Sequence, residues 1–118
     1  ITEGVGESYV IFPELSPSVR GLMVNLSIGD VGDKGGVAFR LSSDVAENAN
    51  VFDWQVGQEH NCILELDGEA EKLSIETTIV RVDELENDEG YEIGVSFAPV
   101  PRAYFVRMEK FWERVERG

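Results

Sequence analysis

The stretch Tyr91-Glu92-Ile93-Gly94-Val95-Ser96-Phe97 decides the fold, because the hydrophobic period changes directly after it. Within this stretch apolar residues take every second position, which is the period of a half-buried β-strand. After two prolines, apolar residues fall instead on one stripe of an α-helix. The members of the stripe are Tyr104, Phe105, Met108, Phe111, Trp112 and Val115. We therefore predict a strand over residues 91–98 and a C-terminal helix over about 101–117.

The chain before this stretch contains five further segments with strand character, each rich in β-branched or aromatic residues and bounded by turn residues. They cover residues 9–12, 21–27, 37–41, 62–66 and 73–82. The segment 42–59 is polar, and we expect a long connection in which Val51, Phe52 and Trp54 return to the core. Six strands without helical crossovers predict an all-β antiparallel barrel or meander, closed by the C-terminal helix.

The composition limits the class of protein. A length of 118 residues suits one domain, and we treat residues 1–118 as a single domain. One cysteine and one histidine exclude a disulfide scaffold and a His/Cys zinc site. No apolar run is long enough to cross a bilayer and no secretory leader is visible, so we expect a cytoplasmic protein without membrane insertion.

The charge excludes another class of partner. Ten basic residues against 23 acidic ones give a net charge of -13, which repels the backbones of DNA and RNA. The last seventeen positions carry a local charge of +2, so the rest of the chain carries -15. We interpret this tail as a solvated helix face, with docking on an anionic partner as the alternative.

No catalytic or metal-binding pattern emerges from the sequence. His60 and Cys62 share one face of a strand, but the sequence shows no partner that would orient either of them. The acidic residues of segment 83–89 lack the ordered spacing of a calcium loop. The glycine-rich segment 29–36 lacks the Gly-Lys-Ser/Thr ending of a phosphate loop and precedes a strand rather than a helix. We therefore predict neither an enzyme nor a cofactor.

The order of several small motifs resembles the PilZ domain, a bacterial module known as a receptor for cyclic di-GMP. Four segments carry the resemblance, and together they span about residues 21–115. They are Val24-Asn25-Leu26-Ser27, Gly57 leading into Cys62-Ile63-Leu64-Glu65-Leu66, Thr78-Ile79-Val80-Arg81-Val82, and the opening stretch with its aromatic helix. The resemblance implies a six-stranded antiparallel β-barrel with a C-terminal helix, in agreement with the hydrophobic periods.

The ligand motifs depart from the family pattern. The family's Arg-x-x-x-Arg motif, whose guanidinium groups pair with phosphates and stack on guanine, is missing, because no basic residue precedes Arg20. Asn25 and Ser27 match the second ligand motif, but Asp30 stands where its glycine belongs and Gly29 comes one position early. A carboxylate about 4 Å from a phosphate costs about 1 to 4 kcal/mol. The resemblance thus implies a vestigial site for cyclic di-GMP at Asn25, Ser27, Gly29 and Arg20.

Our leading hypothesis is a PilZ-like regulatory domain of cyclic di-GMP-linked signalling with a degenerate ligand motif. It would act by binding a protein of pilus, flagellar or exopolysaccharide machinery, with Phe111, Trp112 and Arg107 as candidate partner contacts. A first alternative is a working cyclic di-GMP receptor whose arginine motif lies upstream of the numbered chain, with Arg20 or Arg40 adding a phosphate contact. A second is an unrelated β-barrel adaptor or small-molecule carrier, although six strands leave little room for a cavity.

Overall fold

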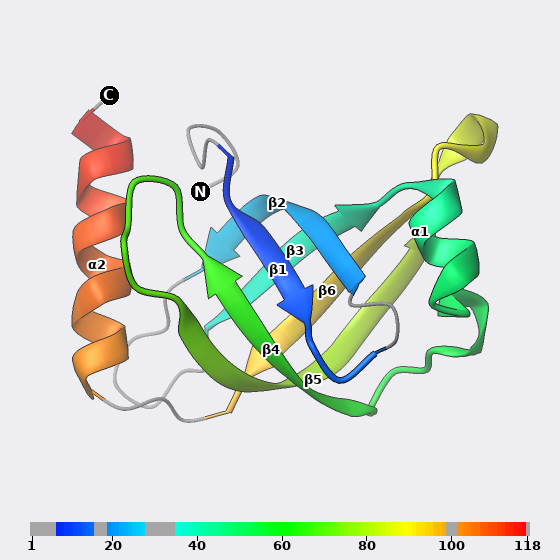
Figure 1. The fold of residues 1–118 in the computed structure, drawn as a ribbon, viewed down its shortest axis with the longest axis horizontal. Coiled ribbons are helices and arrows are strands. Elements are labelled where there is room, and N and C mark those ends of the chain that lie inside the picture. Colours follow the sequence, from blue (N-terminus) through cyan, green and yellow to red (C-terminus); the bar gives the residue numbers. More distant parts are fainter. Residues whose placement is uncertain (1–6, 16–18, 28–34, 99–101, 118) are drawn as a thin grey trace.

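The computed structural model describes residues 7–15, 19–27, 35–98 and 102–117, and it shows a β-barrel with helices at its ends (Figure 1). The strands are β1 (Tyr9–Phe12), β2 (Val19–Ser27), β3 (Gly36–Leu41), β4 (Glu59–Glu65), β5 (Leu73–Glu84) and β6 (Tyr91–Phe97). The helices are α1 (Ser43–Asn48) and α2 (Arg102–Arg117), with short 3-10 turns η1 (Val51–Asp53) and η2 (Glu86–Asp88). No helix among the described residues has the length and apolar character of a membrane span.

The strands close into a barrel in the order β1-β2-β3-β6-β5-β4, and every neighbouring pair is antiparallel. This confirms the predicted six-stranded antiparallel barrel with a C-terminal helix. The predicted alternation is also present, because every second residue of β5 from Leu73 to Ile79 is buried. Ile93, Val95 and Phe97 of β6 are buried in the same way. Alternate side chains of all six strands therefore fill the barrel interior.

Two β-bulges change the direction of side chains along their strands. In β2 the register with β3 shifts between Met23 and Asn25, and in β5 the register with β6 shifts between Ile79 and Arg81. A bulge inserts one extra residue and so re-aims the side chains that follow it. After the first bulge Leu26 is fully buried, while Ser27 beside it is exposed.

The two helices lie at opposite ends of the barrel (Figure 1). Helix α2 places Met108 and Phe111 in the core, where they are 2% and 1% exposed. On the same side Arg114 donates a hydrogen bond to the carbonyl oxygen of Asp67, in the turn between β4 and β5, at 2.5 Å. Helix α2 therefore covers its end of the barrel and is tied to the β4–β5 turn.

The connection between β3 and β4 contains a helix that the sequence did not predict. Helix α1 follows Ser42, whose hydroxyl accepts a hydrogen bond from the backbone N–H of Val45 at 3.4 Å. Six residues are too few to repeat an amphipathic period, so the helix has no hydrophobic signature. Val51 and Trp54 are buried as predicted, whereas the side chain of Phe52 lies outside the described part of the structure.

Candidate functional site

Asn25 and Ser27 stand near the end of β2, beyond its bulge. Asn25 is half-buried and pairs in register with Ala38, while Ser27 is exposed and pairs with Gly36. Because the side chain of Leu26 between them points into the core, both polar residues belong to the outer side of the barrel. Gly29, the third expected member of the ligand motif, lies outside the described residues.

Arg20, the fourth expected ligand residue, is placed elsewhere. Its guanidinium carbon lies 3.7 Å from the centre of the Tyr9 ring, and its Nη2 lies 3.8 Å from a carboxylate oxygen of Glu65. A cation above an aromatic face is attracted by the ring's electron density. Along β2, Arg20 and Asn25 are separated by roughly 16 Å. The structure therefore does not bring Arg20 to Asn25 and Ser27.

The outer surface that continues from β2 across β3, β6 and β5 carries two other arginines. Arg40 on β3 donates from Nε to Glu92 Oε1 at 3.0 Å, and Arg81 on β5 donates from Nη1 to Glu92 Oε2 at 2.9 Å. Arg81 also pairs with Asp83. Arg40 and Asp83 each stand opposite Glu92 in the strand register. We call these four residues the outer arginine network.

Contacts within the network favour the charged forms of Glu92 and Arg81. Burial raises the pKa of Glu92, but hydrogen bonds from Arg40 and Arg81 outweigh that effect and hold the pKa below its ordinary value. Hydrogen bonds to Asp83 and Glu92 raise the pKa of Arg81. Gly94 on β6 lies beside Arg81, and a Cβ built there would make ordinary van der Waals contact with the Arg81 side chain at 3.5 Å. Both guanidinium groups are thus already paired with carboxylates.

Sequence reasoning missed the roles of Arg81 and Glu92. The alternation of β6 does place Glu92 on the outer side, and Arg40 alternates in the same way on β3. However, Arg40 and Glu92 are 52 residues apart, and their contact depends on which strands are neighbours. The sequence shows opposite charges at outward-facing positions. It does not show the strand register that brings these charges into contact.

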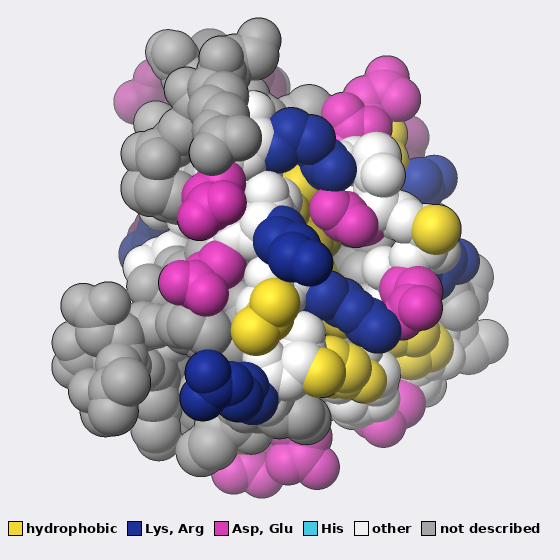
Figure 2. Space-filling model, turned by 90° about the vertical axis from the view of Figure 1, so that its left-hand side faces the viewer, with side chains coloured by type: hydrophobic (Ala, Val, Ile, Leu, Met, Phe, Trp, Pro, Cys, Tyr) yellow, Lys and Arg dark blue, Asp and Glu magenta, His cyan; other side chains and the backbone are white. Residues whose placement is uncertain are grey.

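Helix α2 carries the three expected partner contacts, and the structure describes the side chains of two of them. Phe111 is 1% exposed within the core, so it cannot present its ring to a partner while the helix stays docked. Arg107 pairs with Glu71 at the surface, and the side chain of Trp112 lies outside the described part of the structure. Figure 2 views this side of the molecule and shows Lys and Arg side chains interleaved with Asp and Glu. Of the described basic residues of α2, Arg107 and Arg114 pair with carboxylates of the β4–β5 connection.

His60 and Cys62 face the same side of β4, and both side chains pack against other residues of the barrel. Burial raises the pKa of the Cys62 thiol to about 12, against a smaller opposing effect of a hydrogen bond with Thr77. A thiol that stays protonated at neutral pH is a poor nucleophile. His60 stacks on Trp54 with ring centres 5.3 Å apart and meets the edge of Phe12 at 5.6 Å. The arrangement therefore offers no activated nucleophile at this position.

Comparisons with known proteins report on the fold. No protein-family model matches the chain, and no curated protein matches its sequence. The solved structure of the Bacillus subtilis inhibitor of motility, MotI/DgrA, matches with a TM-score of 0.61 at 16% sequence identity. The match covers 93% of this chain and 44% of that chain, so this chain spans less than half the length of that protein. MotI/DgrA is a PilZ-domain protein, and the six-stranded barrel with its C-terminal helix therefore has a PilZ-like fold.

Proposed function

We propose that this chain is a PilZ-like regulatory domain that acts by binding a protein, and that its site for cyclic di-GMP is degenerate. The outer arginine network is the observation that carries the proposal. Arg40 and Arg81 lie on the sheet that continues from Asn25 and Ser27, and both already pair with Glu92. The domain is expected to regulate another protein and to catalyse no reaction.

Binding of a phosphodiester to these arginines would carry an energetic cost. The phosphate would have to displace Glu92 from two charge-assisted hydrogen bonds and leave that half-buried carboxylate without its partners. The net charge of -13 adds a long-range repulsion to any dianionic ligand. These costs favour a protein as the partner of this surface over a cyclic dinucleotide.

The fold comparison and the family resemblance support a choice among classes of partner. The matching structure is named an inhibitor of motility, which makes a protein of the flagellar machinery the first candidate. Pilus and exopolysaccharide machinery are the other two candidates that the family resemblance implies. The domain would bind such a partner in the cytoplasm.

A titration of the 118-residue chain with cyclic di-GMP, followed by amide-resolved NMR, tests the degenerate site. We expect no saturable shifts at millimolar ligand for the wild-type chain. The double variant Glu92→Gln, Asp83→Asn frees both guanidinium groups and should gain binding near Arg40, Arg81 and Gly94. Saturable shifts at Asn25 and Ser27 in the wild-type chain would overturn the proposal.

A matched control separates the local effect from the change of net charge. The double variant Glu86→Gln, Glu89→Gln removes two negative charges as well, at exposed positions in η2 and directly after it. It should gain no affinity for cyclic di-GMP. If both double variants gain equally, the network does not block the ligand, and only net charge opposes it.

The partner class is tested by swimming assays. Expression of the chain in motile Bacillus subtilis should reduce swimming in soft agar, including in cells whose cyclic di-GMP is depleted by a phosphodiesterase. Unchanged swimming would exclude a flagellar partner of that organism. Loss of the effect on depletion would support the receptor function described next.

A second candidate function is a working cyclic di-GMP receptor. It is favoured by Asn25 and Ser27, which match the second ligand motif and stand on the outer side of β2. The test uses a longer protein that carries its native upstream segment, with Asn25→Ala, Ser27→Ala as the variant. A receptor should bind cyclic di-GMP and lose that binding in the double variant, whereas equal affinity in both would remove this function.

A further inference from the structure

The outer side of β1 and β2 differs in composition from the rest of the chain. The two strands together contain no acidic residue, although the chain has 23, and their only charged residue is Arg20. Val10 and Phe12 are buried in the core, so Tyr9 and Ile11 lie on the outer side of β1. This strand crosses the front of the barrel beside β4 in Figure 1. A strongly acidic chain thus has two neighbouring strands without a carboxylate.

Apolar side chains gather on this outer side. Leu22 is 45% exposed and stands opposite Tyr9 in the strand register. Ile63 lies between two buried residues of β4, points outward and stands opposite Ile11. The centres of protein interfaces are rich in aromatic residues and poor in Asp and Glu. We call Tyr9, Ile11, Leu22 and Ile63 the β1–β2 face, and its composition is that of an interface centre.

One row of residues across this face has opposite charges at its two ends. The register places Glu65 of β4 beside Tyr9, Tyr9 beside Leu22, and Leu22 beside Arg40 of β3. Neighbouring strands lie about 4.8 Å apart, so the row is roughly 14 Å long. The order along the row is therefore acidic, aromatic, aliphatic and basic.

A two-fold axis makes this row complementary to itself. In a symmetric dimer the same patch of both copies meets face to face after a half turn. With the axis along the strands, between β1 and β2, Tyr9 of each copy meets Leu22 of the other. By the same rotation, Glu65 of each copy lies across from Arg40 of the other. Apolar contacts then lie at the centre and ion pairs at the rim, as in most protein interfaces.

Both charged ends of the row have hydrogen-bonding capacity beyond their contacts within the chain. Arg40 donates to Glu92 through Nε, and its side chain is 54% exposed. A guanidinium group has five N–H donors, so its terminal nitrogens can serve a second carboxylate. Carboxylate oxygens of Glu65 lie 3.8 Å from Arg20 and 3.3 Å from Lys72. A carboxylate has about four acceptor positions, so contacts within and between copies are compatible.

The charge of the chain also favours this face over others for self-association. Two copies with a net charge of -13 repel each other wherever acidic surfaces meet. The rotation that brings Tyr9 to Leu22 also brings Ile11 to Arg20 of the other copy, because these two residues are neighbours in the register. An apolar side chain can lie on the aliphatic stem of an arginine. No like charges of these four strand positions therefore oppose each other in the pair.

We propose that the β1–β2 face binds a second copy of this chain in a two-fold symmetric dimer. The inference goes beyond the proposed function, because it needs neither cyclic di-GMP nor a different protein. A face of this size suits a weak dimer, with a dissociation constant on the order of 10 to 100 µM.

Sedimentation of the 118-residue chain at about 5 to 500 µM and about 0.15 M salt tests the dimer. The wild-type chain should shift from monomer to dimer over this range. Leu22→Glu places a carboxylate at the centre of the face and should leave the chain monomeric. Val80→Glu is the matched control, because Val80 is an outward aliphatic residue of β5 that is 52% exposed. It should dimerise like the wild type. A monomeric wild-type chain, or equal loss in both variants, would overturn the inference.

Two charge reversals test the position of the axis. Glu65→Arg and Arg40→Glu each place like charges opposite one another twice, and each should weaken self-association by at least about fivefold. An equimolar mixture of the two variants should form a heterodimer of wild-type affinity, since both pairs between the copies are then of opposite charge. NMR spectra of each variant verify that the barrel stays folded. A mixture no stronger than the separate variants would show that Glu65 does not face Arg40 of a second copy.

The rival occupant of the face is the regulated protein itself. In that case the wild-type chain stays monomeric, and Leu22→Glu abolishes the effect on swimming while Val80→Glu retains it. This outcome would overturn the dimer and leave the proposed function standing. A wild-type dimer without any effect on swimming, pilus-dependent movement or exopolysaccharide output would overturn the proposed function and leave the dimer standing.

Discussion

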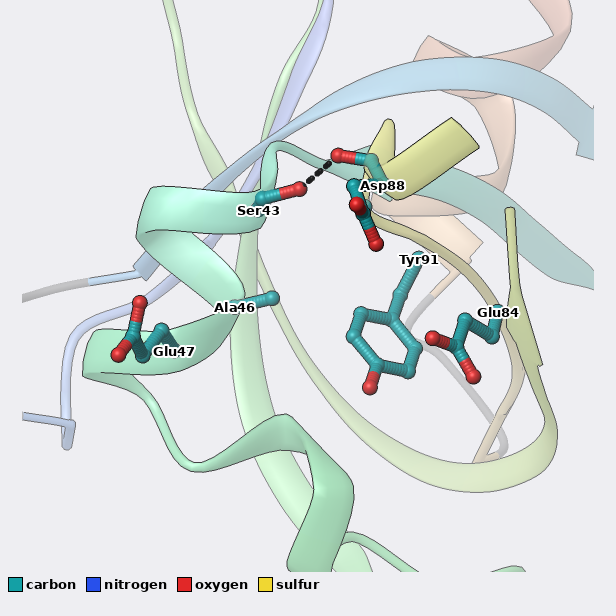
Figure 3. Close-up of a pocket in the computed structure, with 7 residues that line it drawn as sticks. Ser43, Ala46, Glu47, Glu84, Asp88 and Tyr91 are labelled. Atoms are coloured by element: carbon teal, nitrogen blue, oxygen red, sulfur yellow. Dashed lines mark hydrogen bonds between the residues drawn. The ribbon is translucent and has the colours of Figure 1, made fainter. Parts of the chain in front are cut away.

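The two ends of the barrel differ in whether their carboxylates pair with Lys or Arg side chains. At the α2 end, Glu69 pairs with Arg114 at 3.0 Å, and Glu71 pairs with Arg107. At the other end a pocket between α1 and the β5–β6 hairpin is lined by the carboxylates of Glu47, Glu84 and Asp88 (Figure 3). None of these three has a Lys or Arg partner within the described residues. The carboxylates of the first end are paired with the chain's own basic residues, whereas those of the second end are exposed to solvent. One small domain thus carries a paired and an unpaired set of carboxylates at its two ends.

The prediction with the largest expected effect tests whether helix α2 closes its end of the barrel. Phe111→Ala should lower the free energy of unfolding by about 3 to 5 kcal/mol, because it leaves a cavity under the helix. Val106→Ala on the same helix is the control, since Val106 is 36% exposed and should cost less than about 1 kcal/mol. Urea denaturation measures both values. Equal costs would mean that α2 does not seal this end, and the contrast between the ends would disappear.

The second prediction, with a smaller expected effect, tests the backbone conformation of Gly90 at the other end of the barrel. Gly90→Ala should lower the free energy of unfolding by about 2 to 4 kcal/mol, because it adds a steric clash with Leu41 to an unfavourable φ. Gly57→Ala has a similar φ of +98° but no heavy atom within 4 Å of the new Cβ, so about 1 kcal/mol is expected. Thermal unfolding of the two variants gives the difference. If Gly90→Ala costs no more than Gly57→Ala, the close approach that frames the pocket is wrong.

A third effect concerns His60, which lies on β4 away from the α2 end. Burial lowers the pKa of His60 below 6.5, against a smaller raising effect of Glu14. The unfolded chain therefore takes up a proton more readily than the folded one, so stability is complete above pH 6.5 and falls as the pH drops below it. The free energy of unfolding should decline more steeply between pH 7 and 5 for the wild-type chain than for His60→Gln. Parallel profiles would show that His60 charges as easily in the folded barrel as in the unfolded chain.

Most of the fold could be predicted from the sequence, because the barrel is built from strands with a clear two-residue period. Thr77 stands on the same face of β5 as its apolar neighbours, and it is 2% exposed with its hydroxyl donating to the His60 carbonyl. The switch of period after β6 likewise predicted α2 to within a residue of its observed bounds. Helix α1 was missed because it is too short to show a period of its own.

The candidate sites were harder to predict, since each depends on contacts between distant segments. The pairing of Arg40 with Glu92 requires β3 and β6 to be neighbours, and no local pattern reports that. The pocket requires Gly90 to approach Leu41, which lies on another strand. Alternation along one strand predicts the side of the sheet on which a residue lies. The residues that it contacts on that side depend on the register between neighbouring strands.

The buried thiol of Cys62 can be used to measure how often the barrel opens. Cys62 is the only cysteine in the chain and is fully buried. An alkylating reagent can reach it only in molecules whose barrel has opened, and the exposed thiol then reacts at the rate of an ordinary cysteine. The labelling rate of the unmodified protein therefore measures how often the barrel opens.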